Sequence, residues 1–206
     1  MAIKYSKNVG AARDNYLRVL QKVKNEKAAA LKSWSDVCIK ELKKVSTVSE
    51  AIAAFRSAPW GTPAKKEALA KWAEVCTTIE ELRAAYDVTY KRFSWIYDNP
   101  VLQKWEWMSC IEVHTATTTD ELESAYYGCP NVREVDHVEN HKPSEVRAFE
   151  KWAQFCSTFE ELEGLCQAVD RTSSRSYQRD AYDKRYDELY FKKKGVYPVR
   201  HQISMM

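Results

Sequence analysis

Residues 71–82 read KWAEVCTTIEEL, and residues 151–162 read KWAQFCSTFEEL. Each stretch contains a Thr followed three residues later by a Glu: Thr78 with Glu81, and Thr158 with Glu161. In such a capping box the Thr hydroxyl accepts a hydrogen bond from the N3 amide, and the Glu carboxylate accepts one from the N-cap amide. Both stretches therefore predict one helix that contains the Trp and a second helix that begins after the Thr.

The same box occurs at two further places, so the pattern recurs four times. The additional boxes are Thr47 with Glu50 and Thr118 with Glu121. Apolar residues follow each Thr at the fourth, seventh and eighth positions, and these positions form one face of a helix. We therefore expect four amphipathic helices that begin in the same way.

Tryptophans precede the four boxes at alternating distances of 13, 6, 13 and 6 residues, so the repeating unit is a pair of hairpins. The predicted fold is all-α: a tandem duplication of a four-helix, two-hairpin unit, forming a helical repeat or a compact bundle with an extra helix at each end. The expected segments are a basic N-terminal helix at 1–27, copy A at 28–92, a junction at 93–99, copy B at 100–170 with an inserted loop at 131–142, and a basic, Tyr-rich C-terminal helix and tail at 171–206.

Composition excludes several classes of protein. The 206 residues include only 5 Gly and 6 Pro, and such a chain has few of the tight turns of a β-sandwich, a Rossmann fold or a P-loop enzyme. No run of hydrophobic residues exceeds five, so no membrane span and no membrane partner are expected. The N-terminus lacks the apolar region of a secretory signal, so we expect a cytoplasmic protein with buried free thiols.

Charge is distributed unevenly along the chain. The net charge is +7 over residues 1–46, −9 over 47–170 and +5 over 171–206. The basic ends either pack on the acidic body or bind phosphate or an acidic partner. Interleaved cations and tyrosines suit nucleic acid, because cations neutralise phosphates and tyrosines stack on unpaired bases. The nucleic-acid candidates are Arg175, Arg179, Arg185, Tyr186, Lys192, Lys193, Lys194 and Arg200.

Two segments are candidates for binding a protein partner. Aromatic residues cluster around the junction, where they either pack between the copies or form an exposed groove. The loop inserted into copy B departs from the duplicated pattern, and binding residues are often found on loops held by a rigid scaffold. The candidates are Trp95, Tyr97 and Trp107 near the junction, and Glu134, Asp136, His137, Glu139 and His141 in the loop.

His137 and His141 are also weak candidates for a metal site. Their spacing places both imidazoles on one side of a helix, and zinc accepts such ligands. The Glu between them is not in the position that a His-Glu-x-x-His protease requires, and the sequence identifies no third ligand. No catalytic residue and no cofactor is expected.

These features favour a non-enzymatic intracellular protein–protein interaction protein. It would be an adaptor, an assembly component, or an inhibitor of a host complex encoded by a virus or mobile element. The alternative is a protein that binds nucleic acid through its basic ends. A metal-dependent enzyme centred on His137 and His141 is the third hypothesis, and homo-oligomerisation stays open.

Overall fold

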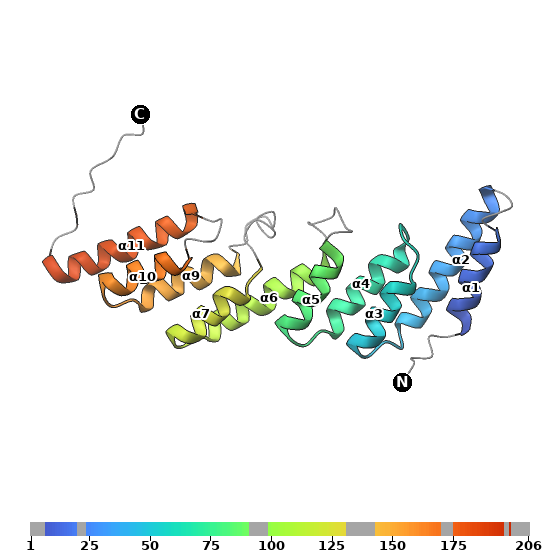
Figure 1. The fold of residues 1–206 in the computed structure, drawn as a ribbon, viewed down its shortest axis with the longest axis horizontal. Coiled ribbons are helices and arrows are strands. Elements are labelled where there is room, and N and C mark those ends of the chain that lie inside the picture. The colour runs from blue at the N-terminus through green and yellow to red at the C-terminus, as the bar shows by residue number, and fades with distance from the viewer. Residues whose placement is uncertain are drawn as a thin grey trace, which may run out of the picture. The chain divides into compact units, whose positions relative to one another are not determined.

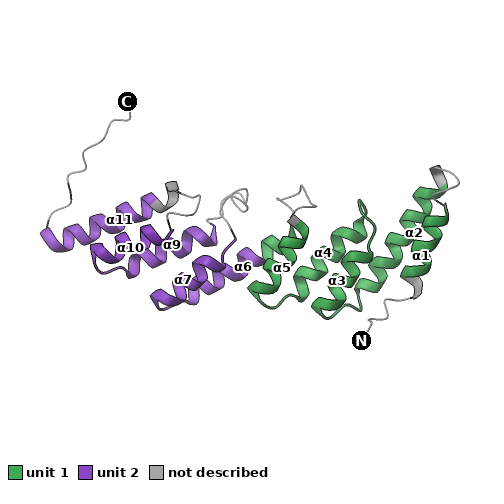
Figure 2. Cartoon of the chain, in the orientation of Figure 1, with its two compact units in different colours: residues 1–104 green, residues 105–206 purple. Residues whose placement is uncertain are grey.

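The computed structural model describes residues 7–19, 24–90, 99–130, 143–169, 175–195 and 198. Within these ranges the chain forms helices and no strand, which confirms the predicted all-α class (Figure 1). None of the described helices combines the length and the apolar character needed to cross a lipid bilayer. The contacts divide the chain into two compact units, residues 1–104 and 105–206 (Figure 2).

The first unit contains α1 (Lys7–Val19), α2 (Lys24–Leu42), α3 (Val48–Ser57), α4 (Pro63–Val75), α5 (Ile79–Tyr90) and the start of α6 (Pro100–Thr115). α2 packs against α1, α3 and α4, and α3 also packs against α4. Phe55, Leu69, Trp72 and Leu82 are among its buried residues. The prediction of one N-terminal helix reaching residue 27 was wrong, because Lys24 already begins α2, which packs beside α1.

The second unit contains the rest of α6, α7 (Thr119–Gly128), α9 (Ser144–Phe155), α10 (Phe159–Val169) and α11 (Arg175–Lys194). α9 packs against α7 and α11, and α10 packs against α11. Their apolar faces meet in one core that includes Leu122, Phe149, Trp152, Leu162 and Leu189. The predicted C-terminal helix is confirmed, and it ends at Lys194, before Gly195, whose positive φ of 74° favours glycine.

All four predicted capping boxes are present in the structure. At each box the Thr hydroxyl accepts from the Glu amide at 3.1–3.3 Å, and the Glu carboxylate accepts from the Thr amide at 3.1–3.3 Å. The carboxylate also accepts from the amide of the residue before the Thr, at 2.6–2.9 Å. This extra backbone hydrogen bond is the main reason that the pKa of each Glu is lowered; the four are Glu50, Glu81, Glu121 and Glu161.

Cationic side chains from neighbouring helices close several helix C-termini. Lys104 Nζ donates to the carbonyls of Glu74 and Cys76 after α4, at 2.8 and 2.7 Å. Lys151 Nζ donates to three carbonyls at the end of α6, at 2.7–2.9 Å. Arg185 donates twice to the Cys156 carbonyl after α9, at 2.8 and 3.0 Å. Since the last carbonyls of a helix carry partial negative charge, these contacts stabilise both the helix and its packing.

Candidate functional site

The buried side of α6 is fixed to the second unit by specific contacts. The indole N–H of Trp105 donates to the Gly128 carbonyl at 2.7 Å, and only 7% of Trp105 is exposed. Glu106 is buried beside it and accepts hydrogen bonds from the Ser144 amide at 2.6 Å and the Ser144 hydroxyl at 2.5 Å. These bonds satisfy the Ser144 amide at the start of α9 and fix the rotation of α6 about its own axis.

The opposite side of α6 is exposed and carries two large apolar side chains among polar ones. Trp107 is 62% exposed, and Ile111, one turn later, is 43% exposed. Successive helix residues are rotated by about 100°, so Trp107 and Ile111 lie about 200° and 240° from Trp105 around α6. Met108 lies beside them and is half-buried. We call the pair Trp107 and Ile111 the outward face of α6.

The positions of α4 and α9 that correspond to Trp107 and Ile111 are charged. Counted back from the Thr of the following capping box, Trp107 and Ile111 stand 11 and 7 residues before Thr118. The same positions are Glu67 and Lys71 in α4, and Arg147 and Lys151 in α9. α4, α6 and α9 each end three residues before that Thr, so the comparison is in register. Of these three helices, only α6 presents apolar side chains there.

Two cations, Arg147 and Lys151, come from α9, the helix that is bonded to α6. Burial raises the pKa of the Cys110 thiol to about 11, and the nearby charge of Glu106 adds to this rise. The Arg147 guanidinium opposes that rise. The Arg147 side chain is exposed, and Lys151 on the same helix contacts the end of α6. α9, which is bonded to α6 at both ends of that helix, thus carries one exposed cation, Arg147, and one cation bonded to backbone carbonyls, Lys151.

Of the other protein-binding candidates, none can be placed. Trp95 and Tyr97 at the junction lie outside the described residues, as do the five candidates in the inserted loop: Glu134, Asp136, His137, Glu139 and His141. Among the residues that are described, no group of three His, Cys, Asp or Glu side chains could hold a metal ion. The metal hypothesis therefore gains no support from the described part of the chain.

The nucleic-acid candidates on α11 divide into two groups. Arg185 binds the Cys156 carbonyl and Glu188, and Tyr186 packs on the core between Tyr182 and Tyr190, with ring centroids 6.0 and 6.3 Å away. These two side chains hold α11 on the unit. Exposed cations remain at Arg179, Lys192, Lys193 and Lys194. Arg175 begins α11 but its side chain is not described, and Arg200 lies outside the described residues.

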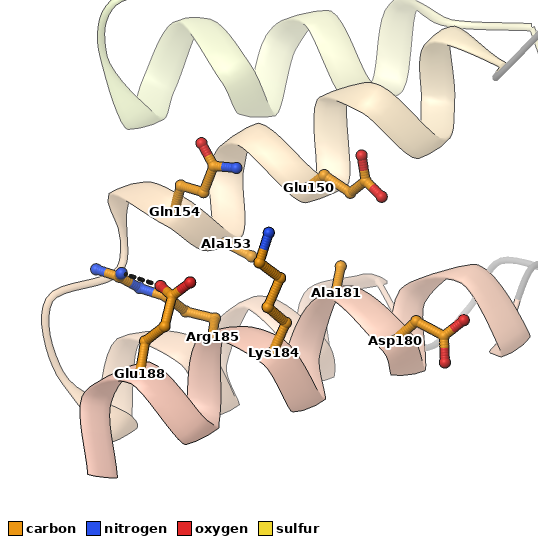
Figure 3. A pocket seen from close by; sticks show the side chains of 8 residues that line it. All are labelled: Glu150, Ala153, Gln154, Asp180, Ala181, Lys184, Arg185 and Glu188. Carbon is orange, nitrogen blue, oxygen red and sulfur yellow. Dashed lines mark hydrogen bonds and ion pairs between the residues drawn. The ribbon is translucent and has the colours of Figure 1, made fainter. Parts of the chain in front are cut away.

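A polar groove of about 250 Å³ lies between α9 and α11 (Figure 3). Acidic residues (Glu150, Asp180 and Glu188) and basic residues (Lys184 and Arg185) face it together. Arg185 Nη1 is 2.8 Å from Glu188 Oε2, so part of this charge is already paired. Because the two signs are mixed, the lining does not select a ligand of either charge, and the groove is a weaker candidate than the outward face.

Four further cysteine thiols are unsuited to nucleophilic chemistry. Burial raises the pKa of Cys38 and Cys76 to about 11 and that of Cys129 to about 12, and it also raises the pKa of Cys156. The thiolate is the reactive form, so these groups are almost wholly protonated near pH 7.

Sequence reasoning identified Trp107 but missed Ile111. The signal was present in the chain, since aligning the four capping boxes shows Trp and Ile where α4 and α9 carry charges. Comparison with family models, with curated proteins and with solved structures finds no match to this chain. The proposed function therefore rests on the geometry of the outward face.

Proposed function

We propose that this is a non-enzymatic protein-binding protein whose outward face of α6 binds the apolar side of an amphipathic helix in a partner protein. The observation that carries the proposal is the pair Trp107 and Ile111, exposed on one face where the corresponding residues of α4 and α9 are charged. A helix that is apolar on opposite sides is normally covered on both.

The spacing of the two side chains favours a helical partner. Trp107 and Ile111 are separated by one turn, so they form a short strip parallel to the helix axis. An amphipathic helix presents apolar side chains at matching intervals, and helix-in-groove binding uses such anchors. Tryptophan is enriched among the residues whose truncation weakens an interface most.

Charge narrows the chemistry of the partner further. Arg147 is exposed on α9, the helix whose start is bonded to α6, so an acidic residue of a partner helix that extends over α9 would meet positive charge. A partner helix with basic residues at that position would be repelled. We therefore expect a partner helix with apolar residues one turn apart and at least one Asp or Glu flanking them.

The high thiol pKa values argue against a cysteine nucleophile. The more specific functions that the sequence suggests, a cytoplasmic adaptor, an assembly component or a viral inhibitor, remain proposals, and none of them is favoured over the others. The alternative is binding of nucleic acid through Arg179 and Lys192–Lys194, and the experiment must distinguish it from binding of a protein partner.

The test is affinity purification of the tagged protein from the cells that make it, after nuclease treatment, with co-purifying proteins quantified by mass spectrometry. The double variant Trp107→Ala with Ile111→Ala should lose at least about 90% of a stoichiometric partner, because hot-spot truncations cost about 2 kcal/mol or more. Phe155→Ala is the matched control, since Phe155 is an exposed aromatic of the same unit that lies on α9 and is not part of the outward face. Equal recovery by all three proteins, or partners that vanish with nuclease alone, would refute the proposal.

A further inference from the structure

A second surface, in the first unit, has a lining of a different chemistry. A groove of about 740 Å³ lies between α1, α2 and the turn that joins α3 to α4. Three aromatic side chains line it, Tyr16, Trp34 and Trp60, together with two arginines, Arg13 and Arg56. This volume is within the range of about 300–1,000 Å³ that is usual for ligand pockets. Sequence reasoning singled out none of these residues as a binding residue.

The turn between α3 and α4 holds Trp60 at the edge of the groove. The Thr62 hydroxyl donates to the Pro59 carbonyl at 2.7 Å, and Pro63 occupies the first turn of α4. Gly61 has a φ of 73°, a conformation that a residue with a side chain rarely adopts. The turn is thus fixed at both ends, and Trp60 is left 48% exposed.

Aromatic groups form two sides of the groove. The rings of Tyr16 and Trp34 pack together, with centroids 5.4 Å apart. Trp60 contacts Phe55 edge to face at 6.2 Å, and the buried Lys65 ammonium lies 4.3 Å from the centroid of the Trp60 ring. These contacts orient Trp60 before any ligand arrives, which lowers the entropic cost of binding.

The charge at the groove is positive. Arg13 and Arg56 are exposed, and neither forms an ion pair with any residue that the structure describes. They come from different elements, α1 and the last turn of α3. Residues 1–104 carry 19 Lys and Arg against 11 Asp and Glu, a net charge of +8. An anionic ligand therefore meets complementary charge both at the groove and across its unit.

We infer that this groove binds an acidic peptide segment of a partner protein, with one large apolar side chain between the aromatic rings and carboxylates at the two arginines. Two features favour a peptide over a nucleic acid. Leu31 and Pro59 give the groove an apolar wall, and its lining offers two cations instead of a row that could follow a phosphate backbone. The planar guanidinium groups match carboxylates in bidentate geometry. The inference does not depend on the outward face of α6.

The test uses isothermal titration calorimetry on the full chain with three probes. They are the acetylated and amidated peptide EDELFDED, its basic counterpart KRKLFKRK, and a twelve-nucleotide oligothymidylate. We expect the acidic peptide to bind and the basic peptide to bind at least about tenfold more weakly, because like charges at an interface are unfavourable. Arg13→Glu combined with Arg56→Glu should weaken the acidic peptide at least about tenfold, and Trp60→Ala at least about fivefold.

Arg18→Glu is the matched control, because Arg18 is exposed on α1 but does not line the groove. Its affinity for the acidic peptide should stay within about twofold of the wild type, since a distant rim charge contributes little. Circular dichroism establishes that each variant is folded. Any of three results would overturn the inference. The acidic peptide does not bind, or it binds the double variant as tightly as the wild type. Alternatively, the oligothymidylate binds more tightly than the acidic peptide, and the double variant abolishes oligothymidylate binding.

Discussion

Two tryptophans of α6, separated by a single residue, should respond to truncation in opposite ways. Trp105 is buried and its indole N–H is bonded to the Gly128 carbonyl at 2.7 Å, whereas Trp107 is 62% exposed. Replacing a buried aromatic residue by Ala costs about 3–5 kcal/mol in free energy of unfolding. Trp105→Ala also leaves the Gly128 carbonyl without its partner, so the upper half of that range applies. Trp107→Ala should change the free energy of unfolding by no more than about 0.5 kcal/mol.

Urea unfolding followed by circular dichroism measures this contrast. With a denaturant dependence of about 2 kcal/mol per molar urea, the expected loss in Trp105→Ala lowers the midpoint by about 2 M. Trp105→Phe keeps a ring in the core and loses the N–H bond, so a loss of about 1–2 kcal/mol is expected. This variant provides a measurable midpoint if Trp105→Ala does not fold.

The comparison also tests the functional reasoning. If Trp107→Ala lowers the stability by more than about 2 kcal/mol, Trp107 is part of the core and the outward face is not available to a partner. A stable Trp107→Ala that fails to bind the partner separates binding from folding. The sequence distinguishes the two through the repeat, in which Trp105 stands 13 residues before Thr118, as Trp34 does before Thr47, and Trp107 has no such counterpart.

Three further outcomes follow from the structure. Lys151→Met should lower the free energy of unfolding by about 1–2 kcal/mol in urea melts, because Lys151 Nζ binds three carbonyls at the end of α6. The control Lys71→Met should change the free energy of unfolding by no more than about 0.5 kcal/mol, since the ion pair of Lys71 is with Glu74 within α4. The pKa of Glu121 is lowered in the folded state, so its contribution to stability is fully present above the ordinary pKa of 4.5 and is lost as the pH falls through the folded pKa. Acid titrations should therefore show a shallower loss of stability for Glu121→Gln than for the wild type. An unchanged slope would contradict this. Burial raises the pKa of Cys129 to about 12, so a thiol reagent at pH 8 should modify it slowly in the native protein and quickly in urea, and rapid native labelling of Cys129 would show that it is accessible.

The helix starts could be predicted because their causes are local. A capping box is completed within five residues, and all four boxes have the predicted hydrogen bonds. The C-terminal helix was predicted from its spaced tyrosines and from Gly195 for the same reason. The boundary between α1 and α2 was predicted less well, because no Gly or Pro marks it in the sequence. The two helices are recognised as separate only from their packing against each other.

The burial of individual aromatic residues depends on contacts that are remote in sequence. The buried Trp105 donates to the carbonyl of Gly128, 23 residues away, and the buried Glu106 accepts from the amide of Ser144, 38 residues away. Neither pairing follows from helical periodicity. The groove in the first unit likewise joins residues of α1, α2 and the α3–α4 turn. Its arginines and tryptophans are unremarkable in the sequence until the fold places them together.

Photo-crosslinking at position 107 tests most directly whether the outward face of α6 binds a partner. Trp107 is replaced by the photoreactive p-benzoylphenylalanine in the cells that make the protein, and Glu67, the equivalent position of α4, is replaced in parallel. We expect one defined, nuclease-resistant protein adduct at 107 whose crosslinked peptide is an amphipathic helix, and no such adduct at 67. The absence of an adduct at 107, or the same set of adducts at both positions, would contradict it.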